Sequence, residues 1–290
     1  MINRLRSLLN LVFCLPAVAA VIAVASSAGA WAQQVASQPI SPADSASATH
    51  SATVSASSMS SRVLACTACH GKEGRATPDG YFPRIAGKPA GYLANQLLNF
   101  RDGRRSYPQM TYLIEHLTDD YLREMAAHFA ALDLPYPPPP APQAPPAALE
   151  RGRVLVQHGD AARSIPACVS CHGAAMTGVN PSIPGLLGLP RDYLNSQLGA
   201  WKTGQRRAHA PDCMADIAKQ LTPDDVSAVS AWLAAQPVAA GGKPARALPA
   251  AMPVRCGGVA GVPVAAAAAA ATAATTATTG SAAPALGAVR

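Results

Sequence analysis

The chain has 290 residues and a formal net charge of +7 at pH 7, and hydrophobic residues make up 49% of it. The positive charge is concentrated at the ends, because residues 241–290 contain four basic residues and no acidic one. Two central blocks are nearly neutral, with nine basic against eight acidic residues in 59–134 and eight against seven in 147–240. A nucleic-acid-binding protein presents a concentrated basic face, so this distribution argues against nucleic acid as a partner.

The first residues have the pattern of a secretory signal peptide. Two arginines precede an apolar run over residues 8–25, and an A-x-A cleavage pattern ends at Ala32. We therefore expect residues 1–32 to be removed on export to the periplasm. An uncleaved membrane anchor is the alternative, although the apolar run is only marginally long enough to span a bilayer. Residues 33–58 are rich in Ser, Ala and Thr, which predicts a disordered leader.

The two central blocks, residues 59–134 and 147–240, resemble each other. Over the 23 positions that begin at Pro83 and Pro184, nine residues are identical and no gap is needed. Such an internal repeat predicts two tandem domains of the same fold. The intervening residues 135–146 are dense in proline, which interrupts helices and sheets, so we expect an extended linker there.

Each block is predicted to be helical. In the first block, apolar residues at helical spacing follow Pro89, and Gly103 is placed to end that helix with a left-handed cap. The last helix is predicted to begin at Thr118, a favoured N-cap residue with acidic residues after it. The second block repeats these features, and neither block shows the alternation typical of strands. The predicted fold class is therefore all-α, followed over residues 241–290 by a low-complexity basic tail without stable structure.

A Cys-x-x-Cys-His segment occurs in each block, at residues 66–70 and 168–172. Three chemistries use such cysteines: a four-cysteine zinc site, a thioredoxin-like redox pair and covalent haem attachment. Zinc does not need a trailing histidine in both copies, and thioredoxin chemistry needs a βαβ setting that is absent. Two thiols one helical turn apart can each form a thioether with one haem vinyl group, and the next residue can then bind the iron. We therefore expect two covalently bound haem c groups.

The predicted thioether residues are Cys66, Cys69, Cys168 and Cys171, and the predicted iron ligands next to them are His70 and His172. The sixth ligand of each iron must come from the opposite side of the ring. Met110 and Met214 stand at corresponding places, 40 and 42 residues after the two histidines, in predicted loops. A methionine opposite a histidine is a common haem ligand pair. His116 and His209 are the alternatives.

These motifs together resemble class I cytochrome c. Each block has Cys-x-x-Cys-His-Gly, a proline before "IAG" or "LLG", a "YLxxQL" segment, a "GxR" segment and a methionine. The two-copy arrangement is similar to that of the dihaem cytochrome c4 family of periplasmic electron carriers. The resemblance covers both blocks but neither the leader nor the tail, and it implies two tandem domains that are each wrapped around one haem. It also implies that Pro83 and Pro184 accept a hydrogen bond from the ring of the iron-binding histidine.

Two further cysteines, Cys213 and Cys256, lie outside the repeated motif. In an oxidising compartment, two leftover thiols favour a disulfide bond. Such a bond would hold the tail beside Met214. The alternative is a buried free thiol at Cys213 and a second free thiol in the tail.

Electron transfer is the function that these features favour. Ligation by histidine and methionine fills all six positions of an iron and leaves none for a substrate. We therefore expect an electron carrier without catalytic residues, which passes electrons from a dehydrogenase or quinol-oxidising complex to a terminal oxidase. A cytochrome subunit of a membrane-bound dehydrogenase, associated with the membrane through its partner complex, is one alternative. A dihaem peroxidase, which needs an open position on one iron, is another.

Overall fold

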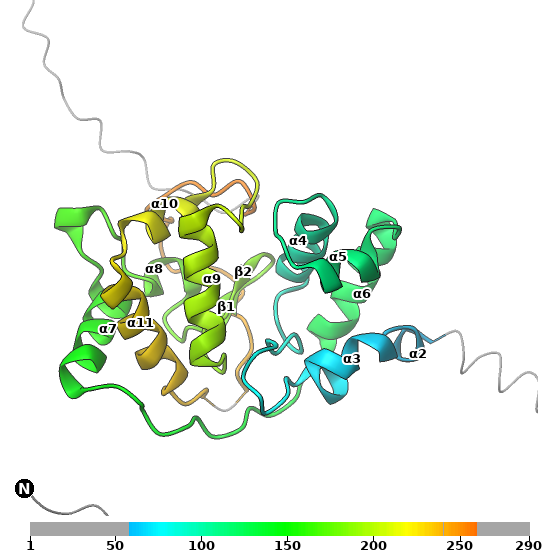
Figure 1. Ribbon diagram of the computed structural model, residues 1–290, viewed down its shortest axis with the longest axis horizontal. Helices are drawn as coiled ribbons and strands as arrows, with labels where there is room; N and C mark the ends of the chain where they lie inside the picture. The colour runs from blue at the N-terminus through cyan, green and yellow to red at the C-terminus, as the bar shows by residue number, and fades with distance from the viewer. Residues whose placement is uncertain (1–57, 240, 260–290) are drawn as a thin grey trace, which may run out of the picture. The chain divides into compact units, whose positions relative to one another are not determined.

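The computed structural model describes residues 58–239 and 241–259, and the chain is mostly helical there (Figure 1). The expected signal peptide, the leader up to residue 57 and residues 260–290 lie outside the described residues. The elements are α2 (Met59–Arg62), α3 (Leu64–His70), η1 (Lys72–Gly74), α4 (Ala90–Arg101), α5 (Pro108–Ile114), α6 (Asp119–Ala131), α7 (Pro146–His158), η2 (Ala161–Arg163), α8 (Val169–His172), β1 (Gly178–Val179), β2 (Ile183–Pro184), α9 (Arg191–Thr203), α10 (Cys213–Gln220) and α11 (Pro223–Ala234). No helix within the described ranges is long and apolar enough to cross a membrane.

The first lobe, residues 58–134, is built on the packing of α4 along α6, with α5 against α4 and α2 against α6. Leu122 and Phe129 of α6 are buried against Leu93 and Phe100 of α4. The predicted start of α6 is confirmed, because the Thr118 side chain accepts a hydrogen bond from the backbone N–H of Tyr121. This cap satisfies one of the backbone donors that a helix leaves unpaired at its start.

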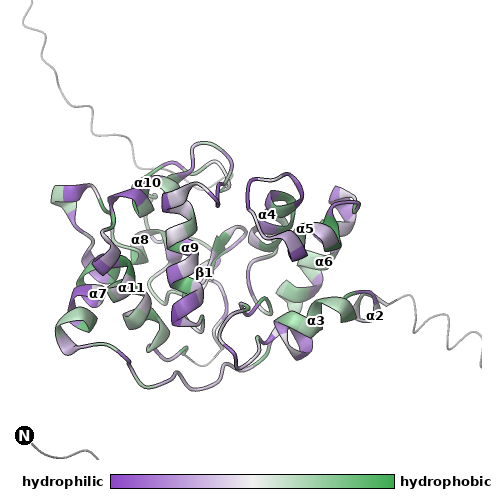
Figure 2. Ribbon diagram, in the orientation of Figure 1, coloured by the Kyte–Doolittle hydropathy of each residue, from purple (hydrophilic) through white to green (hydrophobic). Residues whose placement is uncertain are grey.

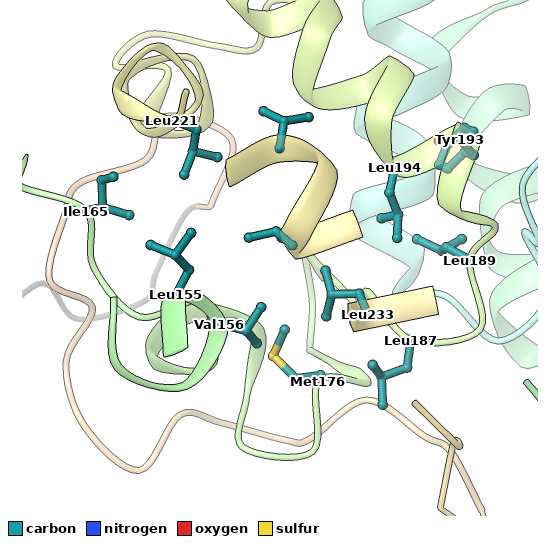
Figure 3. Close-up of a cluster of buried hydrophobic side chains, with 12 residues drawn as sticks. Leu155, Val156, Ile165, Met176, Leu187, Leu189, Tyr193, Leu194, Leu221 and Leu233 are labelled. Carbon is teal, nitrogen blue, oxygen red and sulfur yellow. The ribbon is translucent and has the colours of Figure 1, made fainter. Parts of the chain in front are cut away.

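The second lobe, residues 146–239, is built on α11, which packs along α7 and also contacts α9. Figure 2 shows α11 as mainly hydrophobic, whereas α7 and α9 carry hydrophilic stretches. Figure 3 shows the core of this lobe, in which Met176 lies among Val156 and Leu233. A side chain at Gly152 of α7 would collide with the Ala228 carbonyl of α11, so glycine is required for this close helix contact.

An ion-pair network holds the start of α11. Thr222 and Asp225 form a capping box, in which each side chain accepts a hydrogen bond from the other residue's backbone N–H. The buried Asp225 carboxylate also accepts hydrogen bonds from Arg151 at 3.0 Å and Arg163 at 2.6 Å. The two arginines lie on α7 and η2, so this network ties three elements of the second lobe together.

A two-stranded antiparallel hairpin departs from the purely helical prediction. Gly178 pairs with Pro184, and Val179 pairs with Ile183. Each strand has only two residues, which is too short to produce a readable alternation of polar and apolar side chains. The hairpin positions Pro184 in the second lobe, and the rest of the fold is helical as predicted.

The prediction that the tail lacks stable structure is wrong for residues 241–259, which we call the strap. The backbone of Ala245 donates to the Gly178 carbonyl and accepts from the Asn180 N–H, each at 2.9 Å. Met252 is 1% exposed and packs against Val179 and Ile183. The strap is ordered because the hairpin offers it unpaired backbone groups and an apolar surface.

The proline-rich linker has neither helix nor strand between residues 132 and 145, and α7 begins at Pro146. Its first part is held by the buried Arg84 of the first lobe. This guanidinium donates to the carbonyls of Leu134 and Pro135 and lies 4.0 Å from the centre of the Tyr136 ring. The beginning of the linker is therefore fixed to the lobe that it leaves.

Candidate functional site

Each Cys-x-x-Cys-His segment lies on a short helix. Cys66 and Cys69 stand one helical turn apart on α3, which ends at His70. In the second lobe, Cys168 caps α8, which ends at His172. None of these four cysteines is in a disulfide bond, so all four sulfur atoms are available for thioether bonds. The local helices therefore bring two thiols and one imidazole together in each lobe, as the spacing predicts.

Both histidine rings are oriented by a proline carbonyl. Nδ1 of His70 lies 2.9 Å from the Pro83 carbonyl oxygen, and Nδ1 of His172 lies 2.8 Å from that of Pro184. A carbonyl oxygen can only accept, so Nδ1 carries the proton and Nε2 keeps its lone pair. Burial lowers the pKa of both histidines, which keeps the rings neutral at pH 7. A neutral imidazole held through Nδ1 is the usual form of a histidine metal ligand.

The two motifs line one cavity of about 870 Å³. Its walls include the four motif cysteines, both histidines and apolar side chains from both lobes, among them Leu93, Phe129 and Leu194. This size and lining are typical of cofactor pockets. Within the described ranges, no three His, Cys, Asp or Glu side chains gather as metal ligands.

Met110 and Met214 both line this cavity, but helices carry them rather than the predicted loops. Met110 lies on α5 and Met214 is the second residue of α10. The Pro108 ring at the start of α5 and the Asp212 cap of α10 explain these helices, because both are favoured at helix starts.

The alternative ligands are less well placed. The His116 side chain is 90% exposed and does not line the cavity. His209 lines the cavity from an exposed loop. Met125 also lines the cavity, but it is buried in the core of the first lobe. The matched pair Met110 and Met214 therefore has the better geometry for two equivalent sites.

Two arginines that sequence analysis left without a role join the lobes at the cavity wall. Arg105 donates to Gln96 at 3.0 Å and to Gln197 at 2.6 Å, while Arg206 donates to Gln197 at 2.8 Å and to Gln96 at 3.0 Å. The four residues are identical pairs in the repeat, which was the signal that could have found them.

No carboxylate of the described chain pairs with Arg105 or Arg206. Burial lowers the pKa of Arg206, because removing a guanidinium from water disfavours its charge. A buried cation, Arg206, and a half-buried one, Arg105, beside an apolar cavity fit a ligand with a flat apolar body and acidic groups. Haem combines an apolar ring with two propionates, so the residues present fit haem.

The strap forms part of the cavity wall next to Met214. Cys213 and Cys256 are joined by a disulfide bond in the structure. Gly257 donates to the Pro211 carbonyl at 2.9 Å, and Asn95 of the first lobe donates to the Gly258 carbonyl at 2.9 Å. The strap thus encloses the methionine side of the second site, as expected for this cysteine pair.

Comparison with known proteins identifies the family. The family model described as cytochrome c matches residues 150–236. The thiosulfate dehydrogenase electron acceptor of Thiomonas intermedia (strain K12) is 37% identical over 173 residues, which are 60% of this chain and 79% of that protein. Cytochrome c4 of Pseudomonas aeruginosa is 31% identical over 174 residues, which are 59% of this chain and 84% of that protein.

A solved structure agrees with these relatives. Reduced cytochrome c4 from Pseudomonas stutzeri superimposes with a TM-score of 0.53 at 28% identity, covering 60% of this chain and 95% of that chain. Cytochromes of this family bind haem c covalently through the Cys-x-x-Cys-His segment. The chain is therefore a member of the cytochrome c family, in its cytochrome c4-like branch, and is an electron-transfer protein rather than an enzyme.

Proposed function

We propose that the chain is a periplasmic carrier that binds two haem c groups and passes electrons between redox proteins. Cys66 and Cys69 hold the first haem, and Cys168 and Cys171 hold the second. The iron ligands are the pairs His70 with Met110 and His172 with Met214. The observation that carries this proposal is the repeated pairing of a carbonyl-oriented histidine with a methionine on the same cavity.

The bound haem supplies one-electron chemistry, since its iron changes oxidation state by a single electron. The chain's own residues hold and enclose the group. The carbonyls of Pro83 and Pro184 keep each imidazole in the tautomer that leaves Nε2 free. The apolar walls exclude water. The positive charges of the Arg105 and Arg206 guanidiniums balance the negative charges of the haem propionates.

A thiosulfate-oxidising dehydrogenase is the electron donor that we propose. The support is the Thiomonas relative, which is a thiosulfate dehydrogenase electron acceptor. A terminal oxidase is the proposed acceptor, and any association with the membrane would run through such a partner complex. Mixing the reduced dehydrogenase with the oxidised cytochrome tests the donor: reduction within the turnover time of the dehydrogenase supports it, and no reduction refutes it.

Haem content and ligands are tested on the exported full-length protein. A pyridine haemochrome assay against protein mass should give two haem c groups per chain. The oxidised protein should show the red charge-transfer absorption of methionine-ligated ferric haem, at twice the intensity of a single-haem cytochrome c. Half the expected haem, or rapid binding of CO to the reduced wild-type protein at neutral pH, would contradict two filled coordination spheres.

A further inference from the structure

Lys88 of the first lobe reaches into the second lobe. It precedes α4, and it is 3% exposed. Its Nζ donates a hydrogen bond of 3.1 Å to the carbonyl of Gly185. Gly185 directly follows Pro184, whose carbonyl accepts the proton of His172 Nδ1. A lysine of one lobe therefore contacts the segment that orients the histidine of the other.

This ammonium is buried without an acidic partner. None of the ion pairs in the described part of the chain includes Lys88, and the charged group that acts on its pKa is the cationic Arg84. Nζ also lies 6.0 Å from the centre of the Tyr136 ring, which offers a weak attraction. Burial and, to a smaller extent, the charge of Arg84 together lower the pKa of Lys88 to about 7. Such a group costs stability, so packing alone does not explain why a lysine stands there.

The first lobe makes this contact with the second lobe, but the repeat does not provide the reverse contact. In the repeat, the position of Lys88 corresponds to Leu189, a buried apolar residue that packs in the core of the second lobe. The second lobe therefore has no cationic side chain at the corresponding position to contact the Pro83 segment.

We propose that Lys88 is a positioning residue through which the first lobe raises the reduction potential of the haem iron in the second lobe. The inference rests on the proposed function. A positive charge favours the state of the iron that has gained an electron, and the hydrogen bond to Gly185 holds the Pro184 carbonyl in place for His172. Hydrogen bonds and charges around the axial ligand are known levers on haem potential.

The size of the effect follows from Coulomb's law. At an effective dielectric constant of about 20, a unit charge within roughly 10 Å of an iron shifts the equilibrium for electron uptake roughly tenfold. Tenfold corresponds to about 59 mV for a one-electron couple. The first haem should shift by a clearly smaller factor, since Lys88 points toward Gly185.

The test is a redox titration of the holoprotein at pH 6, where the Lys88 ammonium carries its charge. Lys88→Gln keeps a hydrogen-bond donor and removes the charge, and Lys88→Arg keeps the charge. Lys219→Gln is the control, because it removes one positive charge from an exposed side chain of the second lobe, which holds the haem under test. Met214→Ala identifies the titration wave of the second haem.

We expect Lys88→Gln to lower the potential of the second haem by the tenfold factor, while Lys88→Arg and Lys219→Gln leave it near the wild-type value. An unchanged second wave in Lys88→Gln, with two haems still bound, overturns the proposal. Equal shifts in Lys88→Gln and Lys219→Gln also overturn it, because the potential would then depend on the net charge of the protein and not on the position of Lys88.

A second measurement does not depend on the potentials. Brief acetylation of the intact holoprotein, followed by mass mapping, should modify Lys219 well before Lys88. Equal rates would show that Lys88 is not buried between the lobes.

Different results refute the proposed function and the inference about Lys88. A wild-type protein with fewer than two haems refutes the proposed function, whereas a two-haem protein whose second potential ignores Lys88 refutes only this inference.

Discussion

Removing the disulfide bond between Cys213 and Cys256 should destabilise the second lobe and loosen the strap around Met214. The bond joins residues that are 43 positions apart. Closing a loop of that length removes conformational entropy from the unfolded chain worth about 4 kcal/mol at 25 °C. The strap's other attachments are the buried Met252, hydrogen bonds at Lys243, Ala245, Gly257 and Gly258, and the exposed ion pair between Lys243 and Asp133, and none of them is covalent. We therefore expect Cys213→Ser with Cys256→Ser to lose most of that stabilisation.

Urea unfolding of the oxidised holoprotein measures this loss. With a slope of about 2 kcal/mol per molar urea, the midpoint of the second lobe should fall by about 2 M. The charge-transfer absorption of methionine-ligated haem shows whether the strap still holds Met214 in place. Loss of the Met214 ligand should remove half of this absorption. The first lobe contains no disulfide bond and serves as an internal control. The reasoning is refuted if the double variant unfolds at the wild-type midpoint, or if mass spectrometry finds both thiols free in the exported protein.

Three further predictions concern the ligands and the scaffold. Met110→Ala and Met214→Ala should each let CO bind to one reduced haem, and spectra that still show no CO binding would reject these ligands. Asp225→Asn should lower the unfolding free energy by about 1–3 kcal/mol, measured by urea titration, because Arg151 and Arg163 lose their shared buried carboxylate and keep only Asp160. Burial raises the pKa of Asp225, but the hydrogen bonds from Arg163, the Thr222 N–H and Arg151 outweigh it and hold the pKa below its usual value. The stabilisation is therefore present above pH 4 and is lost as the pH falls further. Gly152→Ala should cost about 1–3 kcal/mol in a thermal melt, because its new methyl group meets α11.

The helices could be predicted where a local signal starts or ends them. Thr118 and Thr222 are N-caps in the structure, as their sequence context predicts. The left-handed glycine after α9, Gly204, was equally readable. These features depend on a few neighbouring residues, so one sequence is enough to find them.

The strap and Lys88 could not be predicted, because both depend on contacts between distant parts of the chain. Met252 stands in a stretch that is rich in Ala, Gly and Pro, and only the hairpin of the second lobe makes it a core residue. Cys256 was the one signal in that stretch. Lys88 looks like a surface residue at the start of a helix, and nothing nearby in sequence indicates that Gly185 covers it.

The two sites begin from the same motif, but their surroundings make them different. His70 and His172 have matching hydrogen bonds, and Met110 and Met214 stand at matching places on one cavity. Among the described residues, however, a disulfide-linked strap encloses the second site and not the first. Since exposure and nearby charge set haem potential alongside the ligands, identical ligand pairs do not imply equal potentials. A duplicated domain can thus give an electron a preferred direction without any change in its iron ligands.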